Sequence, residues 1–287
     1  MPVSTDPSPR SVLITGCSSG IGHAAAHALA GRGWRVLATA RRQEDLDRLR
    51  EEGLEALPLE LASSESIAAC VERVIELTGG QLGALFNNAA YGQPGAVEDL
   101  SREVLREQLE TNLLGTHELT TRVIPAMRER GGGRIVQNSS VLGFAALPYR
   151  GAYVCSKFAL EGLTDTLRQE LHGTGIHVSL IEPGPITSRF RENAYRAFLD
   201  NIDSRHSYHA ETYRALEARL AGKAPGAFTL GPDAVVRKLV HALESRRPRP
   251  RYAVTLPTHL FAALRRILST RGMDRVLLGS TRHERRH

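Results

Sequence analysis

The chain has few cysteines, and their spacing is not that of a disulfide framework or a zinc site. Among its 287 residues only Cys17, Cys70 and Cys155 are cysteines. An odd number, with no C-x-x-C pair, argues against a disulfide framework and against a zinc site of the zinc-finger type. Cys155 is predicted to be a packed small side chain rather than a reactive thiol.

Long apolar runs are also absent. No stretch approaches the roughly 20 apolar residues of a membrane-spanning helix. Residues 1–9 are rich in proline and serine and have no apolar core, so they do not resemble a secretory signal and are predicted to be flexible. These observations predict a cytoplasmic protein in a reducing compartment.

The composition is that of a folded globular protein, with 41% hydrophobic and 24% charged residues. The net charge of +6 comes largely from arginines after residue 245. We interpret them as a solvated surface, because no nucleic-acid reading motif accompanies them and no nucleic-acid partner is expected.

Short apolar runs alternate with amphipathic stretches up to residue 181. Such alternation predicts a parallel sheet in an α/β domain, doubly wound and Rossmann-like, with helices on both faces. Strands are expected at 11–15, 34–40, 55–61, 84–87, 134–138 and 176–181. Helices are expected at 21–31, 43–52, 64–78, 102–130 and 152–172.

The pattern changes after residue 183. Residues 189–222 are polar, aromatic and helical, and are predicted to form a substrate lid on a single domain covering residues 10–256. A helix at 233–244 and a strand at 252–256 are expected to complete that domain. Residues 257–287 form a basic helical extension, whose segment 257–268 is amphipathic. Packing on its own domain, contact with an anionic membrane and contact with a second subunit all remain open for it.

A glycine-rich turn follows the first expected strand and opens the first helix. Its T-G-x-x-x-G-x-G spacing lets the backbone approach a pyrophosphate at a helix N-terminus. The expected contacts are Gly16, Ser18, Ser19, Gly20, Ile21 and Gly22. Arg41 and Arg42 stand where an acidic residue would favour NAD. We therefore predict NADP(H), whose 2′-phosphate a guanidinium can bind, with no carboxylate there to repel it.

Tyr153 and Lys157 are one helical turn apart, so their side chains share a face. A nearby ammonium lowers the pKa of a phenol, which can then exchange a proton while a hydride moves. Ser140 stands thirteen residues before Tyr153, and Asn112 stands further back.

Taken together, these motifs resemble the short-chain dehydrogenases/reductases over residues 10–256. Within that family the chain is similar to bacterial NADP-dependent aldehyde reductases and to hydroxysteroid and retinol dehydrogenases. The resemblance implies that Tyr153 is the general acid, Lys157 holds the nicotinamide ribose and Ser140 binds the substrate oxygen. It also implies that Asn112 kinks its helix and holds a water.

The same resemblance implies further cofactor contacts. Asn88 and Ala89 would line the floor, and Glu60 with Leu61 would bracket the adenine. The nicotinamide would meet Pro183, Gly184, Ile186 and Ser188. Four positions depart from the family: Glu60 replaces the usual Asp, Ala90 the usual Gly, Ser188 the usual Thr, and Cys155 a typically small residue.

The substrate pocket is expected between residues 91–94, 142–149 and the lid. Its expected contacts are Ser140, Leu142, Tyr153 and Phe190. The apolar middle segment favours reduction of aldehydes or lipophilic ketones. Oxidation of hydroxysteroids or retinol is the enzymatic alternative, and a non-catalytic NADP-sensing or scaffold protein is the alternative of another class.

No metal site is expected. His23 and His27 have the spacing of metal ligands, but the sequence shows no third ligand beside them. His206 and His209, in the lid, are expected to be exposed rather than catalytic.

Overall fold

Seven parallel strands form one sheet in the order β3-β2-β1-β4-β5-β6-β7. The computed structural model describes residues 10–222 and 227–281, so the N-terminus at residues 1–9 lies outside the described part. The strands are β1 Ser11–Ile14, β2 Arg35–Ala40, β3 Glu55–Pro58, β4 Ala84–Asn87, β5 Gly133–Asn138, β6 Ile176–Glu182 and β7 Arg251–Ala253. The strand order changes direction between β1 and β4, which is where ligands bind in such sheets. The predicted doubly wound fold is confirmed.

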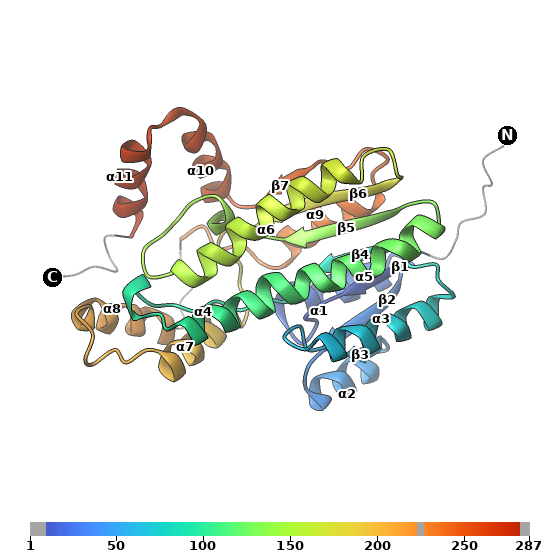
Figure 1. Ribbon diagram of the computed structural model, residues 1–287, viewed down its shortest axis with the longest axis horizontal. Coiled ribbons are helices and arrows are strands. Elements are labelled where there is room, and N and C mark those ends of the chain that lie inside the picture. Colours follow the sequence, from blue (N-terminus) through green and yellow to red (C-terminus); the bar gives the residue numbers. More distant parts are fainter. Residues whose placement is uncertain (1–9, 223–226, 282–287) are drawn as a thin grey trace.

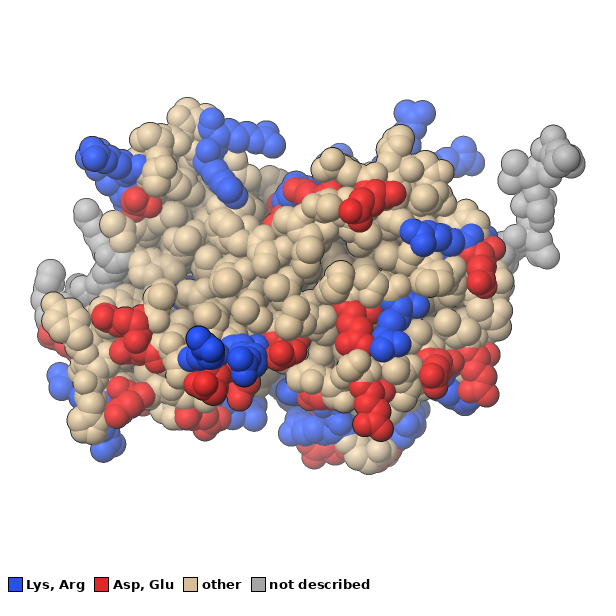
Figure 2. Space-filling view, viewed as in Figure 1, with Lys and Arg blue, Asp and Glu red and all other residues tan. Residues whose placement is uncertain are grey.

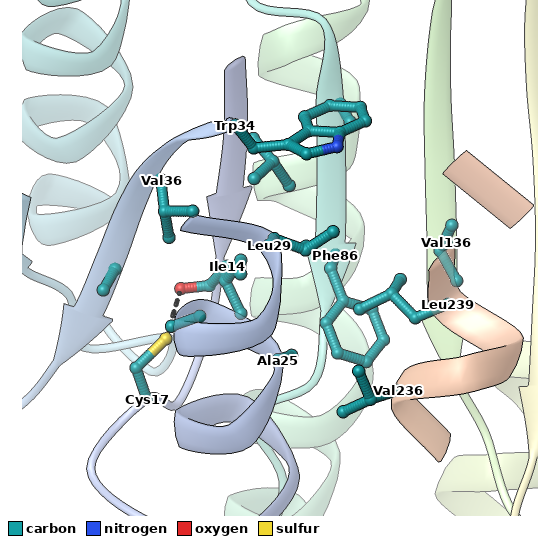
Figure 3. Close-up of a cluster of buried hydrophobic side chains, with 14 of the residues drawn as sticks. Ile14, Cys17, Ala25, Leu29, Trp34, Val36, Phe86, Val136, Val236 and Leu239 are labelled. Atoms are coloured by element: carbon teal, nitrogen blue, oxygen red, sulfur yellow. Dashed lines mark hydrogen bonds between the residues drawn. The ribbon is translucent and has the colours of Figure 1, made fainter. Parts of the chain in front are cut away.

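Helices cover both faces of this sheet (Figure 1). The main helices of the sheet region are α1 Gly20–Ala30, α2 Gln43–Glu51, α3 Ser64–Thr78, α4 Arg102–Leu109, α5 Gly115–Glu129, α6 Gly151–Glu170 and α9 Asp233–Glu244. The alternation of side chains along β1 divides the core, because Val12 and Ile14 pack with α1 and α9 while Leu13 packs with α3 and α5. Figure 3 shows the first of these clusters, with Leu29, Phe86 and Val236 gathered around β1.

Two predicted strand ends are wrong by three residues. The third strand stops at Pro58 rather than at residue 61, and the Leu59 N–H makes the last bond to β2, at 3.0 Å from the Ala40 carbonyl. The helix predicted over 102–130 is present as α4 and α5, joined by a π-helical turn, Glu110–Leu114. The last strand ends at Ala253 because the next helix, α10, starts with Leu256 and has proline in its first turn.

The helices predicted for residues 189–222 are present as α7 Phe190–Asn201 and α8 Ala210–Ala221. They pack against each other through a third apolar cluster in which Phe198 and Tyr213 are fully buried. The Tyr213 hydroxyl donates to Asp99 and accepts a hydrogen bond from the Ala96 backbone N–H at 2.8 Å. The pair of helices is therefore fastened to the loop that follows β4.

In the described part of the C-terminal extension, up to residue 281, the chain forms two helices, α10 Leu256–Ile267 and α11 Thr270–Ser280. Figure 1 shows them and the α7–α8 pair at the end of the molecule toward which β5 points. Arg265 lies over the Phe158 ring at 5.6 Å from its centroid, which ties α10 to α6. Basic side chains gather over α10 and α11, whereas both signs are mixed in the lower part of the view (Figure 2). Within the described ranges, no helix is both long and apolar enough to cross a bilayer.

One charged network joins β6, β7 and α6. Arg251 donates to Glu182 at 2.5 Å, to Asp165 at 2.6 Å and to Glu161. Glu161 and Glu182 are buried, whereas the Arg251 side chain is 38% exposed. Burial raises the pKa of Glu161 to about 7, and Arg251 opposes that rise. One guanidinium therefore keeps two buried carboxylates compensated.

We predict that Arg251→Met lowers the free energy of unfolding by about 2–3 kcal/mol. This is below the ~3–5 kcal/mol of a fully buried pair because the guanidinium is partly solvated. Urea unfolding followed by circular dichroism measures the loss. The exposed Arg247→Met is the matched control and should change stability by less than about 0.5 kcal/mol. Equal stability of the two variants would show that the network contributes little.

Candidate active site

The glycine-rich turn follows β1 and requires glycine at three positions. Gly16 and Gly20 have positive φ angles of 73° and 60°. A Cβ at Gly22 would collide with the Gly16 carbonyl oxygen, and a Cβ at Gly20 would lie 2.9 Å from Ser188. The turn is thus packed so closely that only a bare backbone fits, as a site for a bulky anion requires.

Thr15, which was not among the predicted site residues, holds the floor of this turn. Its hydroxyl oxygen accepts hydrogen bonds from the Asn88 and Ala89 backbone N–H groups at 2.8 and 2.9 Å. The Asn88 amide donates back to the Thr15 carbonyl at 3.0 Å and accepts a bond from Asn138 at 2.9 Å. The carboxyl ends of β1, β4 and β5 are therefore locked together beneath the turn.

The start of α1 presents the anion-binding end of a helix. Its N-cap residue, Ser19, makes no capping bond with its side chain, so the first-turn N–H groups keep the positive character of a helix N-terminus. The Ser18 carbonyl accepts a hydrogen bond from Arg48 at 2.7 Å, which orients the backbone of the turn. With the required glycines, these features fit a dinucleotide diphosphate.

Arg41 and Arg42 follow β2 as expected, but each has an acidic partner. The Arg41 guanidinium is 69% exposed and lies 3.5 Å from Glu60, while Arg42 pairs with Glu44 at 2.8 Å. The expectation that no carboxylate stands near the arginines is wrong, because the end of β3 brings Glu60 beside Arg41. A 2′-phosphate there competes with Glu60 for a weakly held guanidinium.

Tyr153 and Lys157 meet on one face of α6. The Lys157 Nζ lies 5.7 Å from the Tyr153 ring centroid and donates to the Asn138 carbonyl at 2.8 Å. The Ser140 side chain, at the end of β5, makes a hydrogen bond with Tyr153. The structure therefore brings three of the four predicted catalytic residues into one cluster.

Burial controls the protonation of this cluster. It raises the pKa of Tyr153 to about 12, against the opposing hydrogen bond with Ser140. It lowers the pKa of Lys157 to about 8, against the opposing negative charge of Glu161. The expected lowering of the Tyr153 pKa is therefore wrong for the protein's own groups, since desolvation of the phenolate dominates. Tyr153 is a protonated phenol at neutral pH, which suits a proton donor.

Asn112, the fourth predicted residue, lies in the π-helical turn where the helix was expected to kink. Its amide donates to the Tyr91 carbonyl at 2.8 Å and to Ser156 at 3.2 Å, and its oxygen accepts from the Tyr91 N–H at 3.1 Å. The side chain thus clamps the loop after β4 to α6. Its water-holding role stays a prediction.

The loop after β6 closes over the glycine-rich turn. The Pro183 carbonyl accepts from the Val141 N–H at 2.8 Å. Ile186 forms a bridge with Leu230, and Ser188 lies against Gly20. A Cβ at Gly184 would collide with the Thr255 hydroxyl, so the start of α10 supports the same loop. Leu61, the predicted adenine contact, is buried, with the Gly115 backbone packed against its carbonyl.

Phe190, at the start of α7, lies beside Tyr153. Its ring is 5.3 Å from that of Tyr153, edge to face, and it also packs on Gly92. Leu142 follows Ser140 and donates its N–H to the Ser140 hydroxyl oxygen at 3.1 Å. The Gly95 N–H donates to the Tyr149 carbonyl at 3.0 Å, which joins the residue after predicted segment 91–94 to the end of segment 142–149. The Phe190 ring forms an apolar wall beside Tyr153.

Two side-chain predictions near the site are wrong. The His209 side chain is only 21% exposed, because its Nε2 atom lies 2.5 Å from a Glu98 carboxylate oxygen and the Tyr149 ring packs on it. Cys155 is exposed rather than packed, since it lies on the outer face of α6. His206 is exposed, as predicted, beside Asp203 at 2.8 Å.

Comparisons with known proteins agree with this geometry. The sequence profile described as short chain dehydrogenase matches residues 10–197. An uncharacterized oxidoreductase, YbbO of Escherichia coli, is 44% identical over 270 residues, covering 94% of both chains. Human 17-beta-hydroxysteroid dehydrogenase type 1 is 36% identical over 85% of this chain and 77% of its own length.

A solved structure of a ketoreductase is also similar to this chain. A variant of actinorhodin polyketide ketoreductase, solved with NADPH, superposes with a TM-score of 0.69 at 30% identity. The match covers 86% of this chain and 95% of that one.

Proposed function

We propose, from the premise that this chain belongs to the short-chain dehydrogenase family, that it is an NADPH-dependent reductase of aldehydes and lipophilic ketones. The observation that carries the proposal is the Tyr153 hydroxyl, hydrogen-bonded to Ser140 and placed beside the apolar ring of Phe190. That arrangement offers a proton and a hydrogen bond to one carbonyl oxygen next to an apolar surface.

The reduction adds one hydride and one proton to a carbonyl group. A dinucleotide held by the glycine-rich turn and the loop over 183–188 would supply the hydride for the carbonyl carbon. Tyr153 gives its proton to the carbonyl oxygen while Ser140 donates a hydrogen bond to that oxygen, and the product is the alcohol. The phenolate left on Tyr153 is stabilised by the Lys157 ammonium until solvent returns the proton.

The cofactor preference is supported by Arg41, which is exposed and loosely paired, and by the NADPH that the related ketoreductase carries. The glycine turn, Asn88, Ala89 and the loop over 183–188 would hold the rest of the dinucleotide. We propose that the protein is cytoplasmic, because its three cysteines are all free and free cysteines are usual in a reducing compartment. A homo-oligomer is the proposed assembly.

A hydroxysteroid or retinol dehydrogenase activity is the second candidate. It is favoured by the 36% identity to the human hydroxysteroid enzyme and by the same apolar wall. A panel of aldehydes, ketones and steroid and retinoid alcohols, assayed in both directions, separates the two. A non-catalytic cofactor sensor would turn over none of them.

We predict that Tyr153→Phe retains NADPH binding but loses at least about 10³-fold in turnover, since the proton donor is removed while the ring that packs on Phe190 remains. Absorbance of the reduced cofactor measures turnover, and fluorescence titration measures binding. Exposed Tyr208→Phe is the matched control and should behave as wild type. Retained turnover in Tyr153→Phe would remove the phenol from the reaction.

We predict that Arg41→Ala weakens NADPH about 10-fold or more while changing NADH little, because only NADPH carries the 2′-phosphate. Glu60→Gln should act oppositely and tighten NADPH, since it releases the Arg41 guanidinium. Dissociation constants for NADPH and NADH, from fluorescence titration at fixed salt, measure both effects. Equal changes for both cofactors would place the phosphate elsewhere.

We predict that kcat/KM for reduction falls about tenfold per pH unit above roughly pH 8. Below that pH the Lys157 ammonium is present, and above it the charge that stabilises the Tyr153 phenolate is lost. Tyr153 itself adds no limb between pH 6 and 10, because its pKa of about 12 keeps it protonated.

The pH at which kcat/KM begins to fall, the alkaline limb of the profile, tests whether deprotonation of Lys157 causes the fall. Glu161→Gln removes the negative charge that raises the Lys157 pKa and should move the limb to lower pH. Glu170→Gln, exposed on the same helix, should leave it in place. A rate that stays constant up to pH 10, or a limb unmoved by Glu161→Gln, contradicts the assignment to Lys157.

A further inference from the structure

A second group of converging side chains lies outside the dinucleotide site, where α1 meets the end of α2. His23 and His27 share a face of α1, with ring centroids 4.6 Å apart. The Oε2 atom of Glu52 lies 2.7 Å from the His23 Nε2 and 2.8 Å from the His27 Nε2. The expectation that no third ligand accompanies the histidines is therefore wrong, since folding brings Glu52 to them from outside their helix.

We propose that His23, His27 and Glu52 form a binding site for a divalent transition-metal cation of the zinc type. Two imidazole nitrogens and one carboxylate oxygen are donors that such a cation prefers, whereas Mg²⁺ and Ca²⁺ prefer oxygen alone. Three protein ligands leave a fourth tetrahedral position for water. The proposal does not depend on the reaction assigned above.

The three ligand atoms lie within 4.8 Å of one another, and the two distances to the Glu52 oxygen need only a small adjustment to hold a cation. Ligands bound at ~2.0–2.2 Å in a tetrahedron lie about 3.4 Å apart. The Glu52 oxygen thus has to withdraw by roughly 0.6 Å from each imidazole nitrogen, which rotation of its side chain can supply. The imidazoles are 34% and 40% exposed, so a cation can enter from solvent.

The carboxylate is ready to act as a ligand. Its Oε2 atom already faces the Nε2 atoms of both imidazoles. Its other oxygen lies 3.7 Å from the Arg48 guanidinium. Arg48 also donates to the Ser18 carbonyl, so one arginine orients the ligand and touches the glycine-rich turn, as outer-shell partners of metal sites do.

Hydrogen bonding alone is the competing explanation for the cluster. Two neutral imidazoles can each donate an Nε2–H to the same carboxylate oxygen and so join α1 to α2. A metal would take the place of both Nε2 protons, with each imidazole carrying its proton on Nδ1 instead, and would make a stronger link between the same elements. The two explanations differ in whether the negative charge of Glu52 is needed, because an amide oxygen accepts hydrogen bonds but is a poor metal ligand.

The test uses the full chain, stripped of metal with a chelator and titrated with Zn²⁺ against a chromophoric competitor. We expect one Zn²⁺ per chain with a Kd of about 10 μM or lower. At about 100 times the Kd, the melting temperature should rise by roughly 5 °C, because the cation binds only the folded chain. Co²⁺ in place of Zn²⁺ should give the visible absorption of a tetrahedral site.

Three variants locate the cation. His27→Ala removes a ligand, and Glu52→Gln keeps an acceptor for both imidazoles while removing the charge. Each should weaken Zn²⁺ at least about 10-fold and abolish the thermal shift. His206→Ala, an exposed histidine beside Asp203, is the matched control and should bind as wild type. Absence of Zn²⁺ binding below about 100 μM, or undiminished binding by Glu52→Gln, would overturn the proposal.

Discussion

The site depends on the burial of one phenol and one ammonium, those of Tyr153 and Lys157, on a single face of α6. Burial moves the pKa values of Tyr153 and Lys157 in the direction that favours the uncharged forms, and each residue has one group that opposes the effect: Ser140 for the phenol and Glu161 for the ammonium. Glu161 is in turn held by Arg251. The hydride-transfer chemistry at the strand ends is thus linked to an ion network on β7.

Through this link the last strand, β7, affects a site whose other residues come mainly from the ends of the strands β1 to β5. β7 supplies Arg251, and the residues directly after it supply Thr255, which packs on Gly184 in the loop over the glycine turn. A single short edge strand therefore compensates the buried carboxylates behind Lys157 and supports the loop in front of it. The C-terminal extension begins at that point, so its first turn belongs to the architecture of the site.

Much of the fold and the position of the site could be predicted because their signals are local. Strand and helix periodicity, the glycine turn and the spacing of Tyr153 from Lys157 each occupy one short segment. What could not be predicted depends on side chains that converge from distant segments. Glu60 beside Arg41, Glu52 beside two histidines and Arg251 beside Glu161 follow from sheet order and strand length, which no single segment encodes.

The pKa of Tyr153 also could not be predicted from one segment of the sequence. From the sequence, a lysine four residues away is a nearby positive charge, and Coulomb attraction lowers the pKa of a phenol. In the folded chain the loss of water around the phenol outweighs that attraction, and the ammonium is directed to the Asn138 carbonyl instead. The balance between charge and desolvation is a property of the packed site. The same balance keeps the Tyr153 hydroxyl protonated at neutral pH, so that the residue can act as a proton donor.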